Sequence, residues 1–205
     1  NFYHTKIYKI ISSLRKMSIE AIKKMIDDSI ETHKTIHNQA EKIKKASEII
    51  ITGLKQGNKI LSCGNGGSAS QAQHFSAELV GKFEAERSAI SSISLTTDTS
   101  NLTALGNDYG FNTVFKRQVE ALGNPGDVLL CLTSSGNSQN LLEAISMAQS
   151  KDMKIINLLG RDGGKMKNMG NLDIIINSQN TARIQECHIL ILHIIAKLVE
   201  NAFLE

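Results

Sequence analysis

Apolar residues follow a helical period in the first part of the chain. Between residues 18 and 37 they recur every three or four positions, and Ser18 stands where it can cap the segment. A second stretch with the same period runs from about residue 38 to residue 56 and ends at Gly57. The pattern predicts two amphipathic helices, which could cover a sheet or contact a neighbouring subunit.

From residue 59 onward, short apolar runs alternate with helical patterns. The runs lack strict alternation of apolar and polar residues, which is typical of strands buried on both faces. Their alternation with helices favours an α/β fold with a doubly wound, five-stranded parallel sheet. The predicted strands are Lys59 to Cys63, Ala89 to Leu95, Val128 to Leu132, Lys154 to Leu159 and Asp173 to Ile176. Ligands of such sheets bind beyond the carboxyl ends of the strands, where polar loops follow here.

The loop after the first predicted strand is rich in glycine. Asn65, Gly66 and Gly67 precede Ser68 at the expected start of a helix, where exposed N–H groups attract a phosphate or carboxylate. A tight connection without a ligand is the alternative. The loop also fits a dinucleotide-binding pattern, but the acid expected at the end of the second strand is missing, because the first acid beyond that strand is Asp98.

The third predicted strand runs into a second polar loop, in which hydroxyl groups dominate. Its residues are Thr133, Ser134, Ser135, Gly136, Asn137 and Ser138. Ser138 alone would cap the helix that is predicted from about residue 139 to residue 150. A phosphate ester would satisfy all four hydroxyls. The sequence therefore leaves two interpretations open, an ordinary helix start and a phosphate site.

Two predicted helices carry ionisable residues. His74 and Glu78 share one face of the helix that follows the first loop, either as a solvated pair or as part of a site. The last helix, from about Ala182 to Phe203, is apolar on nearly every side, which predicts burial and a subunit interface. Its polar residues are Gln185, Glu186, His188 and His193. Inside such a helix they need protein partners, a ligand or a metal.

Two further segments read as turns. Asn107 and Asp108 stand between Gly106 and Gly110, a combination that is typical of a turn. Residues 160–165, after the fourth predicted strand, are also interpreted as a structural turn.

Composition and charge exclude several classes of protein. The 205 residues are 41% hydrophobic and 21% charged, as expected of one soluble domain. A net charge of +3 and 4% aromatic residues argue against a nucleic-acid partner. No apolar stretch reaches the roughly 18 residues that would span a membrane. Cys63, Cys131 and Cys187 lie within apolar runs without C-x-x-C spacing, which indicates reduced, buried thiols in a cytoplasmic protein.

The first residues are interpreted as an extension. Residues 1–16 have basic residues and an apolar centre, but no cleavage site of small residues follows, so no signal peptide is predicted. Met17 resembles a natural start, and we therefore expect an N-terminal extension at 1–16 and a single domain at 17–205.

Several segments resemble the sugar-isomerase (SIS) family and, within it, the phosphoheptose isomerases. They are SCGNGGS at 62–68, HFSAEL at 74–79, GNDYGF at 106–111, GDVLL and TSSGNS within 126–138, GRDGGKM at 160–166, and RIQE at 183–186 followed by His193. The resemblance covers roughly residues 18–205 and implies the SIS fold. The chain departs from many relatives at Lys82 and Ala182, where they carry Arg and Asp.

The resemblance implies roles for individual residues. The implied substrate-binding residues are Asn65, Gly66, Gly67, Glu78, Asn107, Asp108, Thr133, Ser134, Ser135, Ser138 and Gln185. The implied ligands of one zinc ion per subunit are His74, Glu78, Gln185 and His193. Glu78 and His193 would also form the acid/base pair. The family further implies a homotetramer with sites at subunit interfaces.

The implied reaction agrees with these residue types. Isomerisation of sedoheptulose 7-phosphate to D-glycero-D-manno-heptose 7-phosphate, for bacterial lipopolysaccharide or capsule, moves a proton from C1 to C2 through an enediol. A carboxylate and an imidazole can move protons near neutral pH. The alternative is a non-catalytic SIS protein that binds the replication initiator, but such relatives lack counterparts of Glu78 and His193. A sugar-phosphate-sensing regulator would need an added DNA-binding domain, which no region offers.

Overall fold

Five parallel strands form one sheet in the order β2-β1-β3-β4-β5 in the computed structural model, which describes residues 18–204. The strands are β1 (Ile60–Gly64), β2 (Ser92–Ser94), β3 (Val128–Thr133), β4 (Lys154–Gly160) and β5 (Leu172–Ile176). The chain order reverses between β1 and β3, which confirms the predicted doubly wound sheet. The predicted extension at residues 1–16 lies outside the described residues.

The helices begin and end close to the predicted positions. They are α2 (Ile19–Lys34), η1 (Thr35–Gln39), α3 (Ala40–Lys55), α4 (Gly67–Val80), α5 (Thr99–Tyr109), η2 (Phe111–Thr113), α6 (Val114–Leu122), α7 (Gln139–Ser150), η3 (Gly164–Met166) and α8 (Thr181–Ala202). Among residues 18–204, no helix is both long and apolar enough to cross a membrane.

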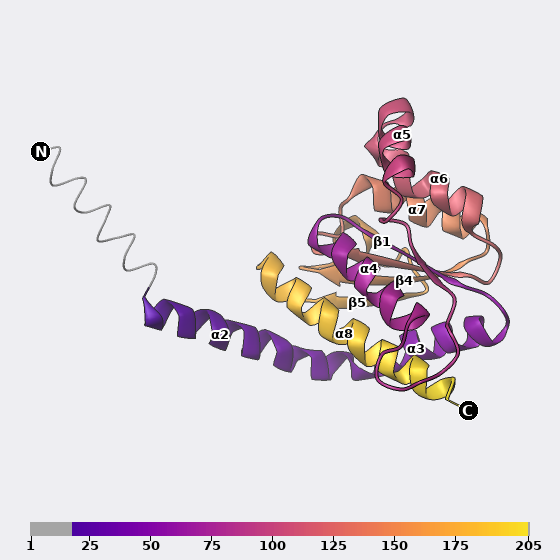
Figure 1. Cartoon of the computed structure of the whole chain (residues 1–205). Helices are drawn as coiled ribbons and strands as arrows, with labels where there is room; N and C mark the ends of the chain where they lie inside the picture. Colours follow the sequence, from indigo (N-terminus) through magenta and orange to yellow (C-terminus); the bar gives the residue numbers. More distant parts are fainter. Residues whose placement is uncertain (1–17, 205) are drawn as a thin grey trace, which may run out of the picture.

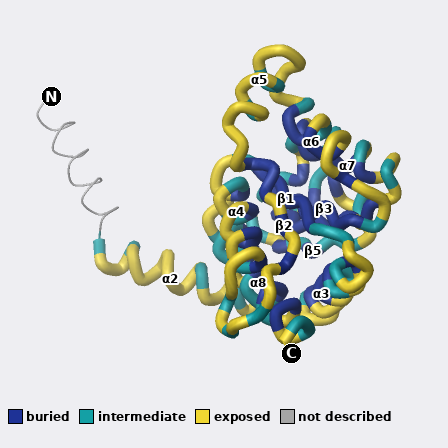
Figure 2. Tube along the Cα trace, turned by 45° about the vertical axis from the view of Figure 1, so that its right-hand side comes forward, coloured by how far each residue is buried: buried dark blue, intermediate teal, exposed yellow. Residues whose placement is uncertain are grey.

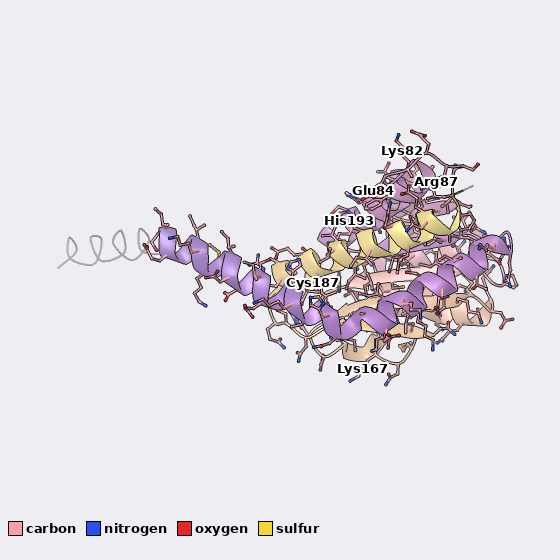
Figure 3. The ribbon with its side chains drawn as sticks, turned by 90° about the horizontal axis from the view of Figure 1, so that it is seen from below. Lys82, Glu84, Arg87, Lys167, Cys187 and His193 are labelled. Atoms are coloured by element: carbon pink, nitrogen blue, oxygen red, sulfur yellow. The ribbon has the colours of Figure 1, made fainter. Side chains whose placement is uncertain are left out.

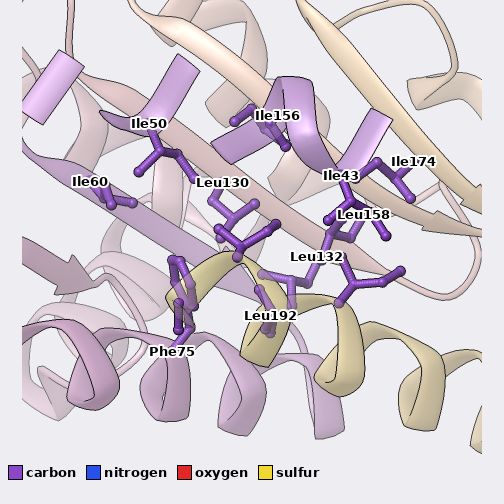
Figure 4. Close-up of a cluster of buried hydrophobic side chains, with 14 of the residues drawn as sticks. Ile43, Ile50, Ile60, Phe75, Leu130, Leu132, Ile156, Leu158, Ile174 and Leu192 are labelled. Carbon is purple, nitrogen blue, oxygen red and sulfur yellow. The ribbon is translucent and has the colours of Figure 1, made fainter. Parts of the chain in front are cut away.

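The sheet is buried on both faces, as the continuous apolar runs predict. Successive strand residues point to opposite faces, so Leu130 joins one core and Leu129 the other. Figure 4 shows the first core, in which Ile50 of α3, Phe75 of α4 and Leu192 of α8 surround the strands. Helices α6 and α7 supply the second core. The strands therefore lie at the buried centre, with helices outside them (Figure 2).

The two helices before β1 behave differently. Helix α3 packs its apolar face on the sheet through Ile43 and Ile50. Helix α2 has no buried residue and extends from the sheet as an arm (Figure 1). Its exposed apolar residues are Ile19, Ile22, Met25, Ile26 and Ile30. Of the two predicted uses of the pair, covering the sheet therefore applies to α3, whereas α2 contacts α8 and leaves its apolar stripe largely exposed.

Two predictions need correction. Strand β2 is shorter than residues 89–95, because it is an edge strand that pairs on one side only, with β1. Asn107 and Asp108 lie in the last turn of α5, and the chain turns only at Gly110, where φ is 82°. Helix α8 leaves Leu190 and Leu198 37% and 38% exposed within one chain, and its predicted burial in a subunit interface stays a prediction.

Candidate active site

The loop between β1 and α4 exposes backbone donors at a helix N-terminus. Gly66 adopts φ 55° and ψ −122°, a conformation that side chains disfavour, and it caps α4 without a side-chain hydrogen bond. The hydrogen bonds from Ser68 N to Asn65 O (3.0 Å) and from Ala69 N to Gly66 O (3.0 Å) close the first turn. The remaining N–H groups and the positive end of the helix dipole can bind an anion.

In the loop between β3 and α7, two hydroxyls are bonded within the loop and two have no partner among the described residues. Thr133 Oγ1 accepts hydrogen bonds from the N–H groups of Ser135 and Gly136, and Ser135 Oγ accepts one from Asn137 N. Ser138 is the N-cap of α7, but its side chain makes no capping hydrogen bond. No hydrogen bond between described residues uses the hydroxyls of Ser134 and Ser138. Two hydroxyls therefore remain available to a ligand beside the N-terminus of α7.

The turn after β4 supports this loop from behind. Met166 N donates to Gly136 O (3.0 Å), and Lys165 N donates to Asn137 Oδ1 (3.0 Å). A Cβ atom on Gly136 would lie 1.9 Å from Gly163 O, so only glycine fits there. The segment that the sequence identifies as a structural turn is thus part of the wall of the β3–α7 loop.

A pair of asparagine side chains joins the two loops. Asn65 Nδ2 donates to Asn140 Oδ1 (3.0 Å), and Asn140 Nδ2 donates to Asn65 Oδ1 (2.9 Å). Asn140 is buried in the first turn of α7. Sequence reasoning missed this residue, although an amide on the buried face of a predicted helix is itself a signal, because buried amides need partners.

Helices α4 and α8 run side by side and bring three predicted site residues together. His74 Nε2 lies 2.8 Å from Glu78 Oε1 and 3.2 Å from His193 Nε2. One ligand atom from each residue lies within 4.8 Å of the others. The rings of His74 and His193 have centroids 5.1 Å apart. The i, i+4 pair of α4 is therefore more than a solvated helix face, because His193 joins it.

These three residues fit a cation. A neutral His74 carries at most one proton on Nε2, so it can donate to Glu78 or to His193 but not to both. Lone pairs of the carboxylate and of the imidazoles therefore face one another across a short gap. Two imidazole nitrogens and one carboxylate oxygen are a ligand set that zinc accepts, with a further position left for water or substrate.

Gln185 lies at the opposite end of the α4–α8 contact. Gln71 Nε2 donates to Gln185 O (2.6 Å), and a Cβ atom on Gly67 would lie 2.5 Å from Gln185 Nε2. Gly67 precedes His74 by seven residues, about 10 Å of helical rise. The Gln185 carboxamide thus faces the first loop, and its predicted role as a zinc ligand stays a prediction.

The other polar residues of α8 have protein partners. Glu186 accepts a hydrogen bond from Ser29 Oγ (2.7 Å) and pairs with Arg183. His188 is fully buried, and its Nε2 lies 3.2 Å from Leu159 O. Glu186 is thus a satisfied polar group, whereas His188 is satisfied only at Nε2, because its buried Nδ1 has no hydrogen-bond partner among the described residues.

Asn107 and Asp108 stand apart from these loops within one chain. Both are exposed in the last turn of α5, where Asn107 Nδ2 donates to Asp108 Oδ1 (2.8 Å). Helix α5 packs on η2 and α6 and projects from the end of the molecule (Figures 1 and 2). Their predicted contact with substrate stays a prediction.

Comparison with known proteins identifies the family. Residues 24–160 match the SIS domain. The phosphoheptose isomerase of Aliarcobacter butzleri is 48% identical over 185 residues, which are 90% of this chain and 98% of that protein. The phosphoheptose isomerase of Helicobacter pylori strain P12 is 50% identical over 188 residues, 87% of this chain and 98% of that protein.

Solved structures give the same result. The phosphoheptose isomerase of Neisseria gonorrhoeae has a TM-score of 0.83 and 42% identity, and covers 89% of this chain and 98% of its own. That of Francisella tularensis has a TM-score of 0.86 and 39% identity with the same coverage. With the SIS-type sheet, the two loops and the His74–Glu78–His193 group in place, this chain belongs to the phosphoheptose isomerase family of SIS-domain proteins.

Proposed function

We propose that this protein is an aldose/ketose isomerase that converts sedoheptulose 7-phosphate into D-glycero-D-manno-heptose 7-phosphate, for bacterial heptose biosynthesis. The observation that carries the proposal is that a carboxylate and two imidazoles, from Glu78, His74 and His193, lie close together. They stand on helices next to two loops that could bind an anion. Relatives that are 48% and 50% identical over most of the chain bear the name phosphoheptose isomerase.

The loops would bind the substrate at its phosphate and along its hydroxyls. The phosphate would lie at the N-terminus of α7, with Ser134 and Ser138 donating their free hydroxyls and Thr133 and Ser135 shaping the loop. Residues 65–67 and the Gln185 carboxamide would contact the sugar at the N-terminus of α4. A dianionic phosphate at a helix N-terminus gains from both the N–H groups and the helix dipole.

Glu78 and His193 would transfer the protons. Isomerisation of the ketose removes a proton from C1, returns one to C2, and moves a hydroxyl proton from O1 to O2. One of the two groups would carry the proton between the carbons, and the other would move the proton between the oxygens. The Glu78 and His193 side chains come from helices that are fixed by packing, so both can be held at the same end of the bound sugar.

A zinc ion is the cofactor that we propose for this site. His74, Glu78 and His193 would hold it, and Gln185 is the fourth ligand that family resemblance suggests. When bound, zinc acts as a Lewis acid toward the carbonyl group of the sugar. The support within the chain is that His74 Nε2 lies close to both Glu78 Oε1 and His193 Nε2. A single proton on His74 Nε2 can satisfy only one of these two acceptors.

The proposed assembly is a homotetramer built from one SIS domain per chain, at residues 17–205. In support, α2 exposes an apolar stripe, and Leu190 and Leu198 of α8 are partly exposed. Asn107 and Asp108 on the projecting α5 would then serve the site of a neighbouring subunit. The proposed location is the cytoplasm, in keeping with three free, buried cysteines, and the product would enter lipopolysaccharide or capsule synthesis.

Purified protein should turn over sedoheptulose 7-phosphate, and a chelator should lower the rate at least tenfold. The reason is that removal of zinc would withdraw its polarising charge from the carbonyl group. Aldose formation is measured before and after treatment with the chelator, and after zinc is added back. Absence of turnover by the untreated, zinc-loaded protein would refute the isomerase. An undiminished rate in metal-free protein would refute the zinc proposal alone.

Replacing Asn140 by alanine should lower kcat/KM about tenfold. The change removes both hydrogen bonds that hold the Asn65 side chain, each with a net value of about 1 kcal/mol, and leaves Asn65 free to rotate out of the site. Steady-state kinetics with sedoheptulose 7-phosphate measure the effect. Gln139→Ala is the matched control, because this exposed neighbour contacts only Glu143 through its side chain. Equal rates for the two variants would show that the Asn65–Asn140 pair has no role.

A further inference from the structure

The chain after α4 folds back over α8 and covers part of the candidate site. This segment, residues 81–88, is called here the 81–88 loop. Figure 3 shows Lys82, Glu84 and Arg87 of the loop gathered on the same side of α8 as His193. Within the loop, Phe83 places its ring 5.6 Å from the His193 ring, centroid to centroid, at an interplanar angle of 35°. The loop therefore supplies a wall against which the His193 imidazole rests.

A buried carboxylate anchors this loop. Glu200 is fully buried and follows His193 by seven residues on α8, so both lie on one stripe of the helix. Glu200 Oε1 accepts hydrogen bonds from Phe83 N (3.0 Å) and Glu84 N (3.2 Å), and its Oε2 accepts one from Glu84 N (3.1 Å). The backbone position of Phe83, and with it the position of the ring, is set by Glu200.

Arg87 connects the same anchor to the turn of α4 that carries Glu78. Its side chain is 1% exposed, and its Nε lies 3.8 Å from Glu200 Oε1. Arg87 Nη2 donates to Glu78 O (2.7 Å), and Nη1 donates to Gly81 O (2.9 Å). These carbonyls belong to the last turn of α4 and the residue after it, where helical acceptors lack partners. Arg87 thus caps α4 where Glu78 projects.

Glu200 is charged in this position. Burial alone would raise the pKa of its carboxyl, but the N–H groups of the 81–88 loop and the Lys197 ammonium together bring the pKa below its ordinary value. The buried ion pair of Glu200 and Arg87 gives little net stability compared with apolar residues of the same size. What these residues do provide is a fixed geometry, because the N–H groups of Phe83 and Glu84 converge on the Glu200 carboxylate and Arg87 binds the carbonyl of Glu78.

We propose that Glu200 and Arg87 are positioning residues for the isomerisation. Glu200 holds the Phe83 ring against the His193 imidazole, and Arg87 holds the backbone of Glu78. One buried ion pair thereby sets the relative placement of the two proton-transferring side chains, which come from different helices. The inference rests on the proposed function, because it assigns the pair a role in that reaction.

Glu200→Gln and Phe83→Leu should each lower kcat about tenfold and leave KM for sedoheptulose 7-phosphate within about twofold. The phosphate loops lie elsewhere and stay intact, whereas a misplacement of about 1 Å at reacting groups can cost up to 10²-fold in rate. Phe83→Tyr keeps the ring and should restore the rate. The double variant should be no slower than the slower single variant, because both changes act through the same ring. The control is Glu86→Gln, an exposed residue of the loop whose side chain pairs only with Lys82.

A measurement without substrate separates this inference from the proposed function. In protein labelled with ¹³C in the histidine rings, the ring current of Phe83 shifts the His193 signal, which His193→Gln identifies. Phe83→Leu should remove this shift, and Glu200→Gln should change it in the same direction, while Glu86→Gln should not. A folded Glu200→Gln protein with an unmoved His193 signal and unchanged kcat would overturn the proposal. Inactivity of the wild type would refute the isomerase, and the His193 signal would still decide whether Glu200 positions the ring.

Discussion

Replacing Glu78 by glutamine is expected to lower kcat by about 10³-fold with little change in fold. The amide keeps the size of the side chain and one oxygen near His74 Nε2, which lies 2.8 Å from Glu78 Oε1 in the wild type. It cannot accept and return a proton, and general acid–base groups typically contribute 10²- to 10⁴-fold to a rate. Packing in the rest of α4 involves Phe75 and Leu79, which the change does not touch.

The experiment compares two reactions of the same variant. Aldose formation from sedoheptulose 7-phosphate gives kcat, and incorporation of solvent deuterium at C1 reports removal of the carbon-bound proton. Loss of both in Glu78→Gln assigns the carbon proton to Glu78, whereas retained exchange with lost isomerisation assigns it to His193. Glu86→Gln, an exposed carboxylate eight residues further on, is the control. Undiminished turnover by Glu78→Gln would remove Glu78 from the mechanism.

The sheet could be predicted because its signal is local. Each strand is a short apolar run bounded by polar or glycine-rich residues, and four of the five strands both begin and end within a residue of the expected position. Edge strand β2 pairs with β1 alone, over three residues, although its flanks remain apolar enough to look like strand. The flanking residues Ile90 and Leu95 are buried, and single hydrogen bonds such as that from Leu95 N to Ser62 O (2.9 Å) join the flanks to β1 without extending the paired segment. Hydrophobicity therefore reports burial and overstates the length of the strand.

The turn preference of Asn107 and Asp108 led to a wrong prediction. Asn107 and Asp108 favour turns in isolation, but α5 begins at an Asp98 cap, whose side chain accepts a hydrogen bond from Asn101 N, and the helix continues through both residues. The turn occurs one residue after Tyr109, at a glycine with positive φ. A helix that begins with a good cap can thus override the turn preference of two residues at its end.

The contacts that complete the candidate site are long-range, and spacing cannot reveal them. His74 and Glu78 share a helix, so their pairing follows from the sequence, whereas the contact of His74 with His193 joins residues 119 positions apart. Asn65 and Asn140, 75 positions apart, meet only because β1 and β3 are neighbours and their loops leave the same edge of the sheet. Family resemblance supplied His193 in advance, whereas the position of Asn140 on the buried face of its helix could show only that it needs a partner, and not that the partner is Asn65.

Acid should destabilise this protein through His188, and His188→Gln should remove that effect. His188 is fully buried on α8, and the loss of hydration lowers its pKa to about 4, while its contact with Leu159 O opposes that shift only in part. The unfolded chain binds the proton near the ordinary pKa of about 6.5. Between these two values the unfolded state holds more protons than the folded state, so the free energy of unfolding falls as the pH falls. The expected loss between pH 7 and pH 4 is about 3 kcal/mol.

Glutamine is the matched replacement, because its Nε2 can donate to Leu159 O as the imidazole does, and it does not titrate. Denaturant unfolding of both proteins at several pH values, at one protein concentration, gives the free energies to be compared. Titration of carboxylates elsewhere contributes equally to both proteins and cancels in the difference. The wild type should therefore lose about 3 kcal/mol more than His188→Gln between pH 7 and pH 4. Parallel curves would contradict the prediction, because they would mean that the pKa of His188 is the same in the folded and the unfolded chain.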